Sequence, residues 1–126
     1  MTSTLEPGPM RVEHGAFTTK AEVLDQLRDL DFWPTTYVSD RMDALPLHWH
    51  PFDNVGFVLE GRTSVLDADG QRIPLGPGDK LVIPAGAVHA EGEVTERTVY
   101  IVGIPMAANL LEVLEFNDPA TSPLRP

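Results

Sequence analysis

Short apolar runs separated by turn residues fill the middle of the chain, from residue 35 to residue 104. Runs this short and this regularly spaced are typical of an antiparallel β-sandwich or barrel, not of alternating β and α units. Gly61-Arg62 and Asp69-Gly70 stand where tight hairpin turns are needed, and Pro74 suits an edge strand. The predicted strands cover residues 35–39, 55–60, 63–67, 71–75, 80–83, 88–94 and 96–104.

Helical periodicity flanks these runs on both sides. Apolar residues recur at helical intervals over residues 20–30, and Thr19 and Glu22 have the spacing of an N-terminal capping box. After the last run, Pro105 opens a second apolar stripe at helical spacing, which stops at Asn117-Asp118-Pro119. We therefore predict one short helix before the β-structure and another after it.

A chain of 126 residues has room for one domain with a real core. Within it we expect three parts. Residues 1–34 form an N-terminal arm and a short helix packed on the barrel, residues 35–104 form the barrel, and residues 105–126 form the C-terminal helix and tail.

Composition narrows the possible partners. The apolar content of 42% is that of a globular protein, and no apolar run approaches the length of a membrane span. The net charge of −10 repels phosphate backbones and anionic lipid, so nucleic acid and membrane surfaces are poor partners. The first residues lack the basic start and apolar core of a signal peptide, and we expect a cytoplasmic location.

Three of the four histidines stand in two short blocks. His48 and His50 are one residue apart, and on a strand their side chains leave the same face. His89 follows a Pro-Ala-Gly turn later in the chain, while His14 lies far from both blocks. The chain has no cysteine, so any metal must be held by nitrogen and oxygen. Imidazoles of this kind suit a divalent Fe, Mn, Ni, Cu or Zn ion.

The two histidine blocks resemble the two motifs of the cupin superfamily. The first motif reads His-x-His, three or four residues, Glu, six residues, Gly; here His48 and His50 are followed by Asn54 and Gly61. The second reads Gly, five residues, Pro-x-Gly, two residues, His; here Gly78 is followed by Pro84-Ala-Gly86 and His89. The resemblance implies a small single-domain cupin with an all-β antiparallel jelly-roll barrel and a metal inside it.

The resemblance also implies a set of metal ligands. Carried over by position, they are His48, His50, Asn54 and His89. Asn54 departs from the family pattern, because a neutral amide replaces a carboxylate. Asp53 is next to it but out of phase on a regular strand, so that only a bulge turns it inward, and we prefer Asn54. Three other carboxylates rank below both: Glu60, Glu91 and Glu93.

Two functions remain open from the sequence. One is a metal-dependent enzyme, dioxygenase-like or isomerase-like, acting on a small organic molecule through open metal positions. The other is a non-catalytic module that binds or senses a small metabolite, with weak metal binding or none, in which the histidines are a polar trio lining a water-filled barrel mouth. In either case we expect a homodimer formed through an edge strand. The aromatic residues Trp49, Phe52, Phe57 and Tyr100 are expected in the core and the pocket lining.

Overall fold

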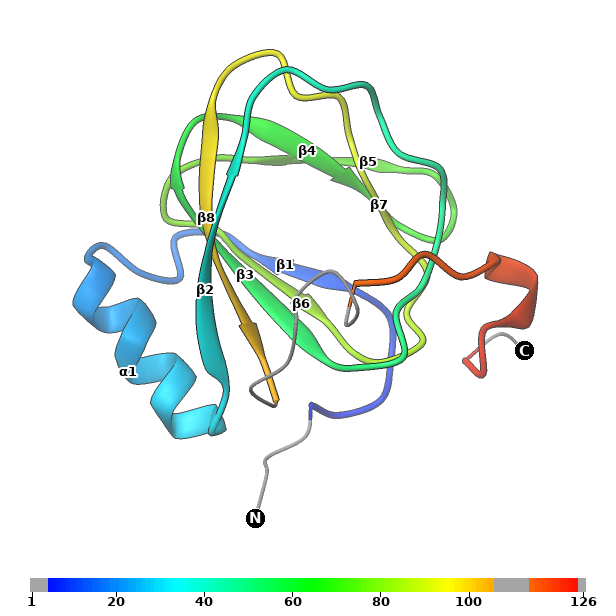
Figure 1. The fold of residues 1–126 in the computed structure, drawn as a ribbon, viewed down its shortest axis with the longest axis horizontal. Coiled ribbons are helices and arrows are strands. Elements are labelled where there is room, and N and C mark those ends of the chain that lie inside the picture. The colour runs from blue at the N-terminus through cyan, green and yellow to red at the C-terminus, as the bar shows by residue number, and fades with distance from the viewer. Residues whose placement is uncertain (1–4, 106–113, 125–126) are drawn as a thin grey trace.

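A computed structural model describes residues 5–105 and 114–124 of the chain. Two β-sheets form the body of the molecule, and every strand pairing within them is antiparallel (Figure 1). The larger sheet contains, in spatial order, β1 (Arg11–Glu13), β6 (Lys80–Ile83), β3 (Asn54–Glu60), β8 (Thr98–Ile104) and β2 (Trp33–Ser39). The smaller sheet contains β5 (Arg72–Leu75), β4 (Thr63–Leu66) and β7 (Ala90–Glu91). This is the predicted all-β jelly-roll barrel.

The strand predictions were close, with four differences of two residues or more; one is that β8 starts at Thr98 instead of residue 96. Strand β1 was missed, because it lies next to the Pro- and Gly-rich N-terminal arm. The segment predicted as a strand over residues 88–94 is regular only at Ala90–Glu91, and isolated bridges such as Met42↔Val94 continue it. Strand β2 starts two residues earlier than expected, at Trp33. Pro74 does lie on the edge strand β5, where its missing N–H breaks no ladder.

Helix α1 (Lys20–Leu30) forms where the sequence predicted it. The hydroxyl of Thr19 accepts a hydrogen bond from the backbone N–H of Glu22, and the Glu22 carboxylate accepts one from the N–H of Thr18. The first bond satisfies an N–H group that the first helical turn leaves unpaired, and the second ties the residue before the cap to the helix. Val23 and Leu27 form the buried stripe of the helix.

Strand β3, at the centre of the larger sheet, is buried on both faces. On one face, Val55 and Phe57 of β3 pack with the buried residues of α1. On the other face, Val58 packs inside the barrel with Val65 of the smaller sheet. Both faces of β3 carry apolar side chains because helix α1 covers one face and the interior of the barrel lies against the other.

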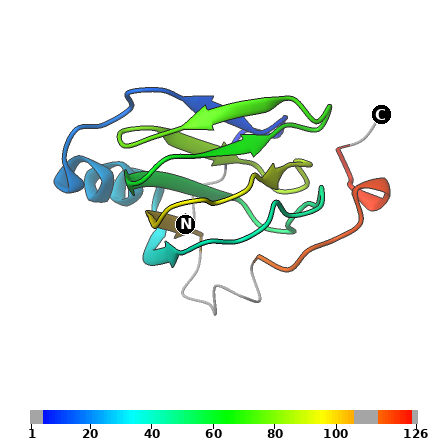
Figure 2. The same ribbon diagram turned by 90° about the horizontal axis from the view of Figure 1, so that it is seen from above.

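The C-terminal segment differs from its prediction. Residues 106–113 of the predicted helix lie outside the described residues. Residues 114–116 are not helical, so this part of the helix prediction was wrong, and Asn117, where the helix was expected to stop, forms an antiparallel bridge with Trp49. The periodic pattern failed here because contacts with a distant segment hold these residues: the Glu115 carbonyl meets His50, and Phe116 stacks on His48. The segment 114–124 and α1 lie on different sides of the barrel (Figure 1 and Figure 2). Across the parts of the chain that the structure describes, we find no helix with the length and apolarity that a membrane crossing requires.

Candidate metal centre

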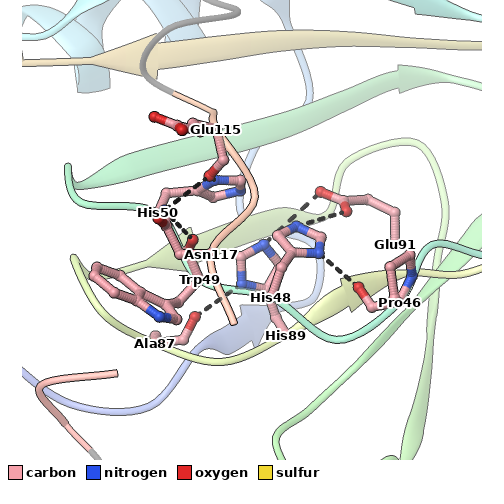
Figure 3. Close-up of polar contacts among 9 residues, drawn as sticks. All are labelled: Pro46, His48, Trp49, His50, Ala87, His89, Glu91, Glu115 and Asn117. Carbon is pink, nitrogen blue, oxygen red and sulfur yellow. Dashed lines mark hydrogen bonds and ion pairs between the residues drawn. The ribbon is translucent and has the colours of Figure 1, made fainter. Parts of the chain in front are cut away.

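His48, His50 and His89 lie together inside the barrel wall (Figure 3). His48 and His89 are opposite each other in an antiparallel bridge, with two backbone hydrogen bonds of 2.9 Å between them. His50 follows on the same face as His48, and the ring centroids of the three are 4.6–5.1 Å apart. All three side chains are almost fully buried. The predicted convergence of the histidines is therefore present in the structure.

Each of these imidazoles has its Nδ1 atom against a backbone carbonyl. The distances are 2.7 Å from His48 to Pro46 O, 2.9 Å from His50 to Glu115 O, and 2.9 Å from His89 to Ala87 O (Figure 3). A carbonyl oxygen only accepts hydrogen bonds, so each Nδ1 must carry the proton.

In the neutral rings this leaves the Nε2 lone pairs free to bind a metal, the tautomer that metal-ligating histidines commonly adopt. One potential ligand atom from each ring lies within 4.8 Å of those of the other two. Nε2 of His48 and Nε2 of His89 are buried and have no hydrogen-bond partner in the described part of the chain.

Burial keeps two of these rings neutral. Desolvation lowers the pKa of His50 and the pKa of His89 to about 4 each, in spite of the carbonyl contacts that favour the protonated form. A metal competes with protons for the same nitrogen atoms. Rings that are neutral near pH 7 are therefore ready to bind an ion.

A carboxylate that the sequence ranked low lies beside the histidines. Oε2 of Glu91 is 3.5 Å from Nε2 of His48, and Oε1 of Glu91 is 3.9 Å from Nε2 of His89 (Figure 3). Its position follows from strand alternation, because Glu91 is two residues after His89 and leaves the same face. That spacing is visible in the sequence, whereas the family motif places the carboxylate at position 54.

Asp53 and Asn54, the two residues that the sequence offered as a fourth metal ligand, have different positions. The carboxylate of Asp53 accepts hydrogen bonds from the backbone N–H of Leu5 and of Ala85, at 2.9 and 2.8 Å, so it supports loops. Asn54 opens β3, is buried, and lines the same cavity as His50 and Glu91. Its Nδ2 atom has no hydrogen-bond partner among the residues described.

A cavity of about 180 Å³ lies next to the centre. His50, Asn54, Glu91, Tyr37 and Tyr100 are the larger polar residues that line it. Burial, with a smaller contribution from the negative charge of Glu91, raises the pKa of Tyr100 to about 12, so its hydroxyl stays protonated. The remaining wall is largely apolar: Met42, Leu45, Leu75, Leu81, Ile83, Val94, Val102, Leu114 and Phe116 among others.

The C-terminal segment completes the site from outside the barrel. Phe116 stacks on the ring of His48, with centroids 4.1 Å apart, and the Glu115 carbonyl meets His50. Trp49, which alternation turns away from its two histidine neighbours, holds the segment in place. Its Nε1 donates to the carbonyl of Asp118 at 2.8 Å, besides the backbone bridge to Asn117. Trp49 thus holds the C-terminal segment against the barrel. The sequence had predicted only that Trp49 packs in the core or lines the pocket.

His14 is separate from this centre, as expected. Its Nδ1 atom lies 3.2 Å from a carboxylate oxygen of Asp79, and both residues line a different, more exposed hollow.

Comparison with known proteins agrees with this fold and site. The sequence model of the family described as Cupin domain matches residues 42–104, half of the 126-residue chain. The chain therefore belongs to the cupin family. The matched segment contains all three buried histidines. No curated protein matches the sequence.

Solved structures also resemble the chain. A cupin-2 domain containing protein from Shewanella frigidimarina is 26% identical, with a TM-score of 0.51 over 60% of this chain and 72% of that one. The polyketide cyclase RemF from Streptomyces resistomycificus is 29% identical, with a TM-score of 0.50 over 59% of this chain and 54% of RemF. A DUF861 family protein from Thermotoga maritima is 16% identical, with a TM-score of 0.54 over 75% and 98% of the two chains, and shows the shared fold alone.

Proposed function

We propose that the protein is a metal-dependent enzyme that acts on a small, largely apolar organic molecule. The observation that carries this proposal is the convergence of three buried imidazoles whose Nδ1 protons are all engaged by backbone carbonyls. His48, His50 and His89 would hold a divalent transition metal through Nε2, with Asn54 or Glu91 as a further oxygen donor. When bound, the ion supplies Lewis-acid or oxygen-binding chemistry.

The residues present fit such an ion. Buried polar groups are normally hydrogen-bonded, and an unpaired one costs about 1–3 kcal/mol. Four buried atoms lack a partner within the described residues: Nε2 of His48, Nε2 of His89, Oε2 of Glu91 and Nδ2 of Asn54. Three of these atoms are potential ligands, and one cation between them would satisfy all three.

The cavity supports the choice of substrate class. Its volume of about 180 Å³ and its apolar wall suit a compact molecule with few polar groups. The likeness to a protein named as a polyketide cyclase also supports an organic substrate. In this chain the apolar wall would exclude water, and the hydroxyl of Tyr100 would donate a hydrogen bond to a substrate oxygen. Dioxygenase-like and isomerase-like reactions both remain proposals for this site.

Metal analysis of protein purified without an affinity tag tests the metal centre. We expect close to one equivalent of a divalent ion, either as purified or after incubation with Fe, Mn, Ni, Cu or Zn and removal of the excess. His48→Ala and His89→Ala should lose this ion, while His14→Ala, at the unrelated histidine, should keep it. Circular dichroism of each variant checks the fold. Less than about a tenth of an equivalent in the wild type would contradict the proposal.

Turnover separates an enzyme from a binding module. The loaded protein should consume oxygen or isomerise a substrate in a screen of small cyclic and aromatic compounds, and His89→Ala should abolish the activity. Compounds that raise the melting temperature without being converted would favour a metabolite-binding function instead.

A further inference from the structure

We infer that Glu91 of β7 supplies the carboxylate ligand of this centre, in place of the missing carboxylate at position 54. This inference rests on the metal-dependent function proposed above and specifies its ligand set. The cupin motif puts a Glu at the start of β3, where this chain has Asn54. The structure offers a carboxylate from a different strand at the same histidine cluster.

The distances from Glu91 to the histidines suit one coordination shell. Ligands bound at about 2.0–2.2 Å from a zinc-like ion lie at most about 4.4 Å from one another. Oε2 of Glu91 is 3.5 Å from Nε2 of His48, and Oε1 of Glu91 is 3.9 Å from Nε2 of His89 (Figure 3). A small contraction would bring these atoms around a single ion.

The hydrogen-bond roles of these atoms call for a cation between them. Because the Nδ1 atoms carry the protons, Nε2 in the neutral rings offers a lone pair, and an ionised carboxylate also only accepts. Oε2 of Glu91 is buried without a hydrogen-bond partner, and its ion-pair contacts in the described structure are with His48 and His89. Acceptors that face one another are stabilised by a positive charge at their centre.

The backbone fixes Glu91 in this position. Glu91 pairs with Val65 across β4 and β7, and its carbonyl accepts a hydrogen bond of 3.0 Å from the N–H of Leu45. Strand alternation then directs the side chain to the face of His89. The competing carboxylate, Asp53, is occupied by two backbone N–H groups. With Glu91 as ligand, the charge of the set equals that of three histidines and one Glu in the family motif.

Cobalt binding to the metal-free protein tests this ligand. Co(II) is titrated into wild type, Glu91→Gln and Glu93→Gln, its visible absorption is recorded, and the affinity is measured by competition with a chelator. Glu91→Gln keeps the side-chain size and removes the charge, so the affinity should fall at least about tenfold. The visible spectrum should change with it. Glu93 is exposed, and Glu93→Gln should bind Co(II) as the wild type does.

A second carboxylate position gives a rescue. Asn54→Glu in the Glu91→Gln background restores a carboxylate to the cavity wall and should recover most of the lost affinity. Equal affinity and spectrum in Glu91→Gln and wild type would overturn the role of Glu91 and leave the three-histidine centre intact. Absence of Co(II) binding in the wild type would overturn both proposals.

A folding control keeps the test decisive. The melting temperature of each metal-free variant is measured first. If Glu91→Gln does not fold, Glu91→Asp replaces it, because the shorter carboxylate cannot reach both histidines at the same distances. A loss of affinity with an altered spectrum supports the inference, and wild-type binding in that variant overturns it.

Discussion

At the residue scale, one backbone carbonyl sets the tautomer of each of the three clustered histidines, and burial keeps His50 and His89 neutral. Pro46 and Ala87 lie two residues before His48 and His89, so these two contacts are local. The third depends on Glu115, which is 65 residues from His50. Alternation along two extended segments thus orients the rings, and only one of the three supporting contacts comes from a distant part of the chain.

The lowered pKa values of His50 and His89 predict an acid-labile metal-free protein. Each pKa is about 4 in the folded state against an ordinary 6.5, so the unfolded chain binds more protons between these values. Stability is therefore fully present above about pH 6.5 and falls as the pH drops towards 4. Urea unfolding of the metal-free protein at pH 7, 5.5 and 4.5 measures this.

The control for this prediction is Glu93→Gln, which should show the same pH dependence as the wild type over this range, since Glu93 is exposed and lies outside the centre. His89→Gln should weaken the dependence of the free energy of unfolding on pH between pH 6.5 and 4. A free energy of unfolding that stays constant over that range in the wild type would contradict the argument.

At the element scale, the tight approach of α1 to the larger sheet depends on Gly103. A Cβ atom at this position would lie 2.2 Å from Cδ2 of Leu27 and 3.1 Å from Cγ2 of Val55. Both neighbours belong to the buried cluster between the helix and the sheet. A side chain on β8 at this point is incompatible with the present helix position.

Gly103→Ala should therefore destabilise the protein by about 1–3 kcal/mol through overpacking. Gly56→Ala is the matched control, because that added Cβ would meet nothing closer than Cβ of Leu81 at 3.8 Å. Combined with Leu27→Ala, the Gly103 substitution should cost less than it does alone, since the clashing methyl group is gone. If the two substitutions change the free energy of unfolding additively in chemical denaturation, the contact between position 103 and Leu27 is not what limits the helix position.

The C-terminal segment is the element that couples the site to the rest of the chain. Trp49→Phe keeps an aromatic ring but removes the Nε1 hydrogen bonds to Asp118 O and Thr121 Oγ1. The segment should loosen, and with it the Glu115 carbonyl that orients His50. We expect metal affinity to fall about tenfold, as for other groups that orient a ligand. Chelator competition measures this loss.

Trp33→Phe is the control for that variant, because Trp33 is an exposed tryptophan on β2, away from the segment. It should bind metal as the wild type does. Equal affinity in all three proteins would show that the Trp49 contacts are not needed for the site.

At the scale of the whole molecule, the two edges of the larger sheet differ. β1 is three residues long and carries Arg11 and Glu13, charges that discourage pairing with another strand. β2 is seven residues long, has no charged residue, and exposes Trp33 and Val38. An uncharged edge of this length, with which no further strand of the described residues pairs, favours pairing with a second copy.

The expected homodimer is testable at this edge. Val38→Lys should shift the protein from dimer to monomer in sedimentation or light-scattering measurements, because a charge would be placed in the strand pairing. Leu24→Lys, at an exposed apolar position on α1, should leave the mass unchanged. A monomeric wild type at micromolar concentration would count against the pairing.

The sequence by itself determined the parts of this protein that depend on local spacing. The period-two pattern of the strands, the capping residues of α1, and the i, i+2 placement of His48 and His50 are set by neighbouring residues along the chain. The cupin motifs added the third histidine, His89, and the barrel that brings it to the other two. These predictions held because alternation and capping act within a few residues.

The tertiary structure decided which groups surround the histidines. Glu91 rather than Asp53 offers a carboxylate to them, the Glu115 carbonyl supports His50, and residues 114–116 are not helical but lead into the bridge between Asn117 and Trp49. Each outcome depends on contacts between segments far apart in the chain, such as the bridge between His48 and His89. Local periodicity assigns a side chain to a face, and only the pairing of distant strands determines what that face meets.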